Sequence, residues 1–334
     1  MPVTSIDVAR RAGVSQPTVS RALRDQPGMS EATRRRVKEA ARELGYVPQQ
    51  SGRSLSTRRS RRIGIVVGEL SNPFYPALLD PMVRELEAQG YLPVLIHDDG
   101  LEEPTTEPIF DGSFDAVLLT TTLLGSSLPG EIERRGIPYV MVNREFVVDR
   151  RARSTAVPDN ATGASLVADL LVDLGHRAVA MVAGPAETST GTERLDGFRD
   201  ALARRGIALH PEAVERVPFS MADGAAATAR LLDRRPVKAI FCANDVLAIG
   251  ALETLARRGL AVPGDVSVVG FDDIPMASLS AIDLSTVAVD LDRLGRRAVR
   301  HLADRARDPE VVPTRVVEPV ELRLRGTHGP ARDY

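Results

Sequence analysis

The chain has 334 residues, of which 43% are hydrophobic, and a chain of this length and composition is expected to form two or three domains with proper cores. The sequence has no run of about 18 apolar residues and no apolar segment after Met1, so we expect neither a membrane span nor a secretory signal. The single cysteine, Cys242, excludes an intrachain disulfide and a cysteine-based zinc site, and it favours a reducing, cytoplasmic location.

Charge is unevenly distributed along the chain. Residues 1–62 hold fourteen Lys and Arg against five Asp and Glu, a net charge of +9, whereas the rest of the chain carries −11. A small basic part joined to a larger acidic part indicates a polyanionic partner for the basic part alone. A solvated charged surface would give the same count, so charge alone does not decide between the two.

The first predicted helix begins near Thr4. Thr4 and Asp7 have the spacing of a capping box, in which each side chain bonds to the backbone of the other residue. Gly13 is suited to the left-handed turn that ends a helix. The residues between them form one apolar face at helical spacing: Ile6, Val8, Ala9 and Ala12.

Two more helices follow closely. Ser15 is placed to cap the second, and Pro17 falls in its first turn, where a missing N–H costs little. Ser30 and Glu31 open a third helix that runs to about Leu44. Two helices joined by a short turn containing glycine, braced by a third, are typical of a helix-turn-helix.

The second helix is predicted to turn polar side chains outward. Arg21 can bond to guanine in a bidentate manner and Gln16 can both donate and accept, so both suit the edges of bases in the major groove. A three-helix bundle without DNA function has the same spacing, and the charge of +9 favours DNA binding. The outward residues, with the cap, are Ser15, Gln16, Pro17, Thr18, Ser20 and Arg21.

Two stretches of this region, "TSIDVARRAGVSQPTVSRAL" and "RRRVKEAARELGYVPQQSGRSL", resemble the DNA-binding head of the lactose and galactose repressor (LacI) family of bacterial transcription regulators. The resemblance implies that residues 1–46 form the head and that residues 47–62 form a hinge. In that hinge, Leu55 would wedge into the minor groove at the centre of the operator and Arg53 would lie near phosphates. Gly52 departs from the alanine usual in the family, and glycine disfavours a helical hinge by about 1 kcal/mol.

From Ile63 onward, short β-branched runs such as "RIGIVV", "AVLL" and "VSVVGF" alternate with helical stretches. This alternation predicts an α/β fold of parallel strands and crossover helices, with binding groups at the carboxyl ends of the strands. Polar or aromatic residues follow four of these runs: Asn72 and Phe74, Asn143 and Arg144, Asn244 and Asp245, and Asp272 and Asp273.

Through "SNPFY", "ERLDGFRDAL" and "VPGDVSVVGFDD", the body resembles the two-lobed, type I periplasmic-binding-protein-like core of the same family. The resemblance implies an effector-binding and dimerisation core over residues 63–334. Its first lobe would comprise 63–158 and 290–316, and its second lobe 159–289 and 317–334. The segment 97–118 is shorter than usual and contains two prolines, which puts the packing of one face of the first lobe in doubt.

The resemblance also implies an effector site between the lobes. Arg194 would bond to ligand oxygens and Asp272 would accept from sugar hydroxyls, although the two could instead form a salt bridge with each other. Thr188 stands where a purine-binding member has arginine, which disfavours a purine and leaves a sugar or sugar derivative. The weaker candidates, which could equally be helix caps or core residues, are Phe74, Tyr75, Asp159, Phe219 and Asn244.

The alternatives to such a regulator are an α/β enzyme and a sugar-binding protein without DNA function. The sequence has no dinucleotide or phosphate-binding glycine motif, and its five histidines are scattered, so we expect no catalytic residue, cofactor or metal site. The C-terminal "RLRGTHGPARDY" lacks the leucine heptads of a tetramer tail, so we expect a homodimer on palindromic double-stranded DNA. The sequence does not identify the effector, nor whether it induces or corepresses.

Overall fold

The structure is a computed structural model that describes residues 3–23, 25–46, 59–98, 107–146, 153–308 and 310–332. The chain divides into two compact units, residues 1–60 and 61–334. The hinge residues Gly52, Arg53 and Leu55 lie outside the described residues.

The described residues of the first unit form three helices: α1 (Ser5–Ala12), α2 (Gln16–Leu23) and α3 (Glu31–Glu43). The capping box of Thr4 and Asp7 is present, and Gly13 ends α1 in the left-handed region at a φ of 64°. Both expectations are thereby confirmed, and so is the cap of α3 by Ser30. The three helices enclose a small core of their own: Val8, Ala9, Ala12, Val19, Ala22, Val37, Ala40 and Ala41.

The second unit is built on two six-stranded sheets, with the strand orders β11-β5-β4-β3-β1-β2 and β12-β10-β9-β8-β6-β7. All neighbouring pairs are parallel except β10 and β12, which are antiparallel. The strands are β1 (Arg62–Val67), β2 (Leu92–His97), β3 (Ala116–Leu119), β4 (Tyr139–Val142), β5 (Thr155–Pro158), β6 (Val179–Ala183), β7 (Val214–Arg216), β8 (Ala239–Cys242), β9 (Ser267–Asp272), β10 (Ser285–Val289), β11 (Arg315–Glu318) and β12 (Val320–Arg323).

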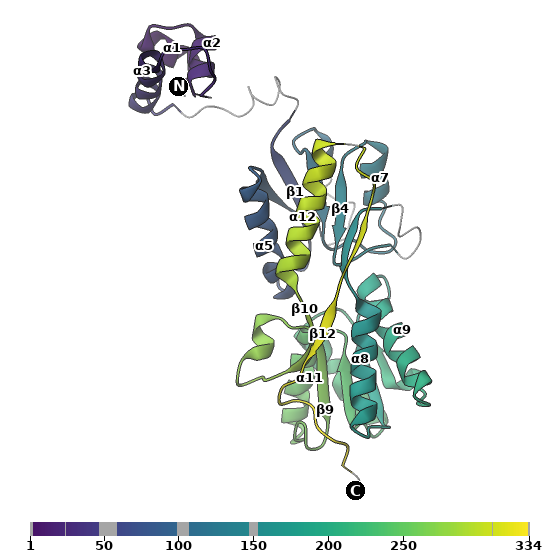
Figure 1. The fold of residues 1–334 in the computed structure, drawn as a ribbon. Helices are drawn as coiled ribbons and strands as arrows, with labels where there is room; N and C mark the ends of the chain where they lie inside the picture. The colour runs from purple at the N-terminus through teal and green to yellow at the C-terminus, as the bar shows by residue number, and fades with distance from the viewer. Residues whose placement is uncertain are drawn as a thin grey trace. The chain divides into compact units, whose positions relative to one another are not determined.

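Helices cover both sheets. In the first lobe α5 and α12 pack against each other, and α12 lies on β3, β4 and β5; in the second lobe α8 packs on α9, and α10 on α11 (Figure 1). The helices are α5 (Phe74–Ala88), α6 (Glu107–Phe110), α7 (Leu128–Arg134), α8 (Asn160–Asp173), α9 (Ser189–Arg204), α10 (Met221–Arg234), α11 (Asp245–Arg257) and α12 (Leu291–Arg307). The expected two-lobed α/β core of parallel sheets is therefore confirmed.

Over the elements that the structure describes, the chain passes between the two sheets three times. The first two passages fall at Asp159 and Asp290, and each aspartate caps the helix that follows it. The expected third boundary, between residues 316 and 317, is wrong because it falls inside β11. That strand stays paired with β5 as far as Glu318, and β12 of the second sheet begins at Val320. The passage therefore falls at Pro319, which has no N–H for the ladder.

Among the described residues, α6 and α7 cover the outer face of the first sheet. Ile109 of the four-residue α6 is buried against this face, together with Leu128 and Ile132 of α7. Leu92 and Leu95 on the edge strand β2 are 50% and 52% exposed. Residues 99–106 are outside the described part of the chain.

Two glycines bring α10 and α11 into backbone contact. A Cβ atom on Gly250 would lie 2.1 Å from the carbonyl oxygen of Met221, and one on Gly224 would lie 2.5 Å from that of Leu247. This close packing fixes the start of both helices, next to Phe219 and Asn244. The contact between α10 and α11 therefore fixes the part of the second lobe that carries Phe219 and Asn244.

Gly250→Ala is expected to lower the free energy of unfolding by about 1–3 kcal/mol, because α10 must shift to accommodate the new methyl group. Denaturant unfolding of the full chain measures this loss. Gly125→Ala is the matched control, since its Cβ would meet nothing within 4 Å. Equal stability of the Gly250 variant and the native protein would show that the helices separate at no cost.

Candidate functional site

The first unit presents the outward face of α2. Gln16, Pro17 and Arg21 are exposed and Thr18 and Ser20 are half-buried, while Val19 and Ala22 of the same helix are buried against α1 and α3. The alternation of buried and exposed positions is that of an amphipathic helix whose polar side is available to a partner.

Two of these side chains are oriented by neighbours. The Gln16 Nε2 donates to Ser5 Oγ at 2.9 Å, which ties the first residue of α2 to α1. Ser15 sits at the expected cap position, where its carbonyl accepts from the Thr18 and Val19 amides. Its hydroxyl pairs with Thr18 Oγ1 at 2.9 Å.

In the second unit a small cavity of about 10 Å³ lies between the lobes. The first lobe contributes residues that follow β1 and β4, and the second lobe contributes residues from α9, from the segment before α10 and from the ends of β8 and β9. The lining residues are Asn72, Phe74, Tyr75, Asn143, Arg144, Thr190, Arg194, Phe219, Asn244 and Asp272.

Arg194 is the most highly coordinated of these residues and is 2% exposed. Its Nε donates to Asn160 Oδ1 at 2.9 Å, and one terminal nitrogen donates to the carbonyl of Ala243 at 2.6 Å. The other terminal nitrogen lies 2.9 Å from Asp272 Oδ1, and the guanidinium lies over the ring of Phe271 at 3.7 Å from its centroid. The mutual salt bridge considered from the sequence is therefore present inside the cavity wall.

Asp272 is strained as well as buried. Its φ is 109°, and that of Asp273 is 56°, both in the region that non-glycine residues rarely adopt. Burial raises the pKa of Asp272 from 3.8 to about 6, although Arg194 beside it acts in the opposite direction. A carboxylate with this pKa changes its charge near neutral pH.

Among the described residues, two buried polar atoms in the cavity wall have no hydrogen-bond partner, Asn143 Oδ1 and Arg144 Nε. Asp272 Oδ1 beside them has its ion pair with Arg194. Arg144 is 2% exposed, and its other nitrogens reach Glu69 Oε1 at 3.0 Å and the carbonyl of Thr121 at 3.3 Å. A buried polar atom without a partner costs about 1–3 kcal/mol, so this cluster favours a ligand that both donates and accepts.

The structure brings together most of the effector candidates taken from the sequence. Phe74, Tyr75, Phe219 and Asn244 line the cavity together with Arg194 and Asp272. Asn244 also caps α11 through the amide of Leu247 at 3.0 Å.

Asp159 is different, because it is not a lining residue. Its carboxylate accepts from the amide and the hydroxyl of Thr162, which is the alternative role as a helix cap. Asp245, another strand-end residue, is fully buried, accepts from the Ile274 amide and the Thr286 hydroxyl, and holds two segments of the second lobe together.

Asn72, Asn143 and Arg144 were candidate ligand groups in the sequence because they follow strands, and the structure places all three in the cavity wall. Thr190 was missed altogether. Its signal is its spacing, since it lies four residues before Arg194 on α9 and so shares the same helix face.

The site is connected to the first passage between the lobes. Asn160, the first residue of α8, accepts from Arg194 and donates to Glu193 at 2.9 Å. Near the third passage, the fully buried Glu318 accepts from Arg293 and Arg297 of α12. The cavity is thus hydrogen-bonded to the first passage through Arg194, and a separate set of bonds at Glu318 holds the third passage to α12.

Comparison with known proteins identifies the family to which this chain belongs. Residues 6–49 match the family described as bacterial regulatory proteins, lacI family, and residues 168–328 match the periplasmic binding protein-like domain. The chain is 36% identical to the HTH-type transcriptional repressor CytR of Escherichia coli strain K12, over 97% of this chain and 96% of that protein. The chain belongs to the LacI family.

Other members of the LacI family are similar over the same length. The HTH-type transcriptional regulator CelR of Thermobifida fusca is 35% identical over 95% of this chain and 96% of its own. Among solved structures, a CelR–cellobiose complex has a TM-score of 0.77 at 33% identity, covering 97% of this chain and 99% of that one. The lac repressor dimer bound to operator and the anti-inducer ONPF has a TM-score of 0.88 at 27% identity, covering 98% and 100%.

Membership of this family makes the chain a DNA-binding transcription regulator and not an enzyme. Within the described ranges, no helix is long and apolar enough to span a bilayer. The same ranges contain no group of three or more His, Cys, Asp or Glu side chains arranged to hold a metal ion.

Proposed function

We propose that this LacI-family regulator is a cytoplasmic, homodimeric repressor whose operator affinity is set by a sugar or sugar derivative bound between its lobes. Arg194 and Asp272 are the principal ligand contacts, and the aromatic rings of Phe74, Tyr75 and Phe219 supply apolar walls. Asn244 supplies a further polar contact. Asp159, once considered with them, is better assigned to its helix cap.

The observation that carries the sugar assignment is the presence of two buried polar atoms without a partner in the described cavity wall, next to the ion-paired Asp272. Asn143 Oδ1 is an acceptor, and Arg144 Nε is a donor. A sugar hydroxyl is both a donor and an acceptor, so a polyol can satisfy both atoms and also donate to Asp272. A purely anionic ligand would satisfy only the arginine and would repel Asp272.

Coupling to DNA follows from the contribution of both lobes to one cavity. A ligand that bonds to Arg144 of the first lobe and Arg194 of the second favours one relative position of the lobes over others. Arg194 is bonded to Asn160 at the passage between the lobes. The ligand therefore also stabilises one conformation of the backbone segment about which the lobes rotate. The expected coupling free energy is about 1–3 kcal/mol.

On DNA, we propose that Ser15, Thr18 and Ser20 contact phosphates, while Gln16 and Arg21 contact base edges beside Pro17. A dimer places two such helices about one turn of DNA apart, so the operator is a palindrome. Arg53 and Leu55 act at its centre, with Leu55 as the minor-groove wedge.

This function predicts a steep dependence of operator affinity on salt, because a head with a charge of +9 displaces counterions from the duplex. Fluorescence anisotropy with a palindromic duplex at several salt concentrations gives the slope, and a panel of sugars at fixed salt shows the effector. A flat salt dependence would contradict the DNA assignment, whereas a panel without effect would contradict the sugar assignment only.

The raised pKa of Asp272 predicts a pH-dependent effector affinity. Below about pH 6 this carboxyl group gains a proton, loses an acceptor site and no longer pairs with Arg194. Affinity for an uncharged sugar is therefore expected to fall about tenfold between pH 7 and pH 5, as the ionised fraction of the group falls. Calorimetry measures the change, and Asp272→Asn should abolish it; a full pH dependence in that variant would assign the effect to another group.

A further inference from the structure

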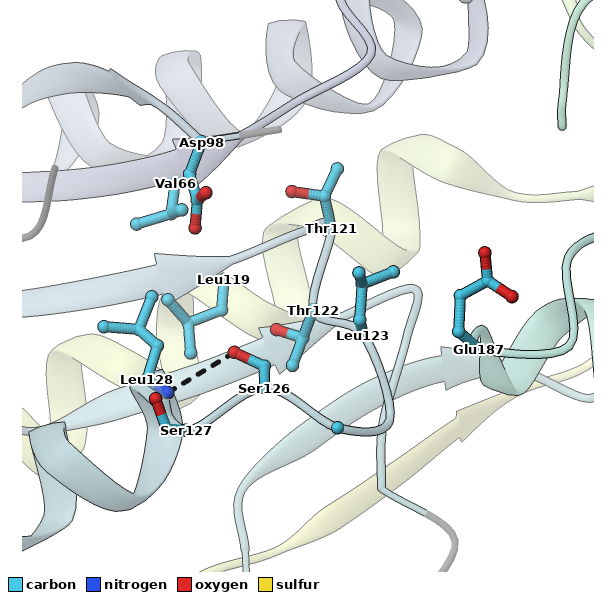
Figure 2. A pocket seen from close by; sticks show the side chains of 11 residues that line it. Val66, Asp98, Leu119, Thr121, Thr122, Leu123, Ser126, Ser127, Leu128 and Glu187 are labelled. Atoms are coloured by element: carbon cyan, nitrogen blue, oxygen red, sulfur yellow. Dashed lines mark hydrogen bonds between the residues drawn. The ribbon is translucent and has the colours of Figure 1, made fainter. Parts of the chain in front are cut away.

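Helix α9 carries Arg194 and also contacts the first lobe. The Leu124 amide of the first lobe donates to the carbonyl of Glu187, just before α9, at 2.8 Å. The Glu145 amide donates to the hydroxyl of Ser189, the first residue of the helix, at 3.1 Å. Glu187 also lines a cavity of about 330 Å³ that follows the ends of β1 and β3 (Figure 2). The helix therefore joins the first lobe to the small cavity between the lobes, here called the cleft cavity.

Close packing brings the start of α8 against α9. A Cβ atom on Gly197 would lie 2.8 Å from the carbonyl oxygen of Ala161 and 2.9 Å from its Cα atom, so the two backbones are in contact at this point. Gly197 lies one turn after Glu193 on α9, and Asn160 directly precedes Ala161 on α8. The glycine therefore allows the side chain of Asn160 to reach two neighbouring residues of α9, Glu193 and Arg194.

The side-chain amide of Asn160 is bonded at both ends. Its oxygen accepts from Arg194 Nε at 2.9 Å, and its nitrogen donates to Glu193 Oε2 at 2.9 Å. Asn160 is 2% exposed, so both ends of the amide need a partner within the protein. A guanidinium offers only donors, and an ionised carboxylate offers only acceptors. Of the two orientations that the amide can take, only the observed one satisfies both neighbours.

The bond from Arg194 to Asn160 depends on the orientation of that amide. The guanidinium of Arg194 also contacts Ala243 and Phe271, whose positions are set by β8 and β9. The contact with Asn160 differs, because a half-turn of the amide would present its nitrogen to Arg194 and remove the acceptor. Glu193 opposes this half-turn, since its carboxylate can bond to the amide nitrogen but not to the amide oxygen.

We infer that Glu193 is a positioning residue of the effector site. Through the amide of Asn160 it holds the guanidinium of Arg194 in the orientation that binds the ligand. Glu193 does not line the cleft cavity, so it acts without touching the ligand. The inference rests on the proposed function for the role of Arg194 as a ligand contact.

The first test needs no sugar. Nuclear magnetic resonance of the full-length protein with isotope-labelled arginine follows the exchange of the Arg194 Nε proton with solvent, and Arg194→Lys identifies its signal. Glu193→Ala should speed this exchange about tenfold or more, because the acceptor of the proton is no longer held in place. Glu193→Gln should keep the rate within about threefold of the native value, because its carbonyl oxygen still accepts from Asn160.

The matched control is Asp200→Ala, which removes the same charge from an exposed position on α9 and should leave the rate unchanged. The backbone amide of Phe198, buried on the same helix, should exchange at its native rate in every variant. Faster exchange of both protons in Glu193→Ala would show that the whole helix has loosened, and would overturn the positioning role. Equal rates in Glu193→Ala and Glu193→Gln would also overturn it, because the acceptor for Asn160 would then not matter.

The second test is calorimetry with glucose, galactose, ribose, cellobiose and lactose. Glu193→Ala should weaken about tenfold the binding of each sugar that the native protein binds, whereas Glu193→Gln and Asp200→Ala should stay within about threefold of the native affinity. Native affinity in Glu193→Ala would overturn the inference, and so would weaker binding with an unchanged Arg194 proton. Failure of the native protein to bind any of these sugars would contradict the proposed sugar effector, and the exchange rates would still decide whether Glu193 positions Arg194.

Discussion

Arg194→Ala is expected to abolish measurable sugar binding and to lower the free energy of unfolding by about 3–5 kcal/mol. The substitution removes the partner of a buried carboxylate, leaving Asp272 and the carbonyl of Ala243 without their donor. Calorimetry measures the loss of binding, and denaturant unfolding measures the loss of stability. Operator affinity should then no longer respond to any sugar in the panel.

Asp272→Asn separates the loss of sugar binding from the loss of stability. It keeps the shape of the side chain and its carbonyl oxygen, so the loss of stability should be much smaller than in Arg194→Ala. The loss of ligand affinity should remain, because the charged acceptor is gone. Ligand affinity unchanged in both variants would remove the pair from the site, and intact ligand binding without an effect on operator affinity would remove the coupling.

Arg21→Ala is expected to cost about 1–3 kcal/mol of operator affinity per half-site and to relax selectivity at one base pair in each. Arg21 is exposed on the outward face of α2, where a guanidinium can bond to the edge of a guanine. Anisotropy with the operator and with duplexes altered at single positions measures both quantities.

The matched control is Arg36→Ala, which removes the same charge from an exposed position on α3. It should weaken binding to every duplex by a similar, smaller factor and reduce the salt dependence. If Arg21→Ala behaves in the same way, with equal loss across all sequences, then Arg21 contacts phosphate alone.

The helical head could be predicted closely because its signals are local. Thr4 with Asp7, and Gly13, fix the ends of α1 within a few residues, and the apolar spacing fixes which faces are buried. The third passage between the lobes was misplaced by two residues because "VVEPVELRL" reads as one continuous strand. Pairing of β11 with β5, far away in sequence, decides that the break is at Pro319.

The site could be predicted only in part, because its residues are brought together from segments far apart in the sequence. Strand-end position pointed to Asn143, Arg144 and Asn244, but position alone cannot distinguish a ligand group from a helix cap. Asp159 and Asn244 both cap helices, and only the tertiary arrangement shows that Asn244 also lines the cavity. The cavity lined by Val66, Leu119, Leu128 and Glu187 had no signal in the sequence, since its walls come from separate strands and Glu187 comes from the other lobe.

The small volume of the cleft cavity has a consequence for rates. A space that holds about one water admits a sugar ring only after the lobes have moved apart. Binding then includes an opening step that does not depend on ligand concentration, and the observed association rate levels off at high sugar concentration. The apparent affinity equals the intrinsic affinity multiplied by the fraction of open molecules, so it falls as that fraction falls. Substitutions that loosen the contact between Leu124 and Glu187 therefore speed the response of the regulator.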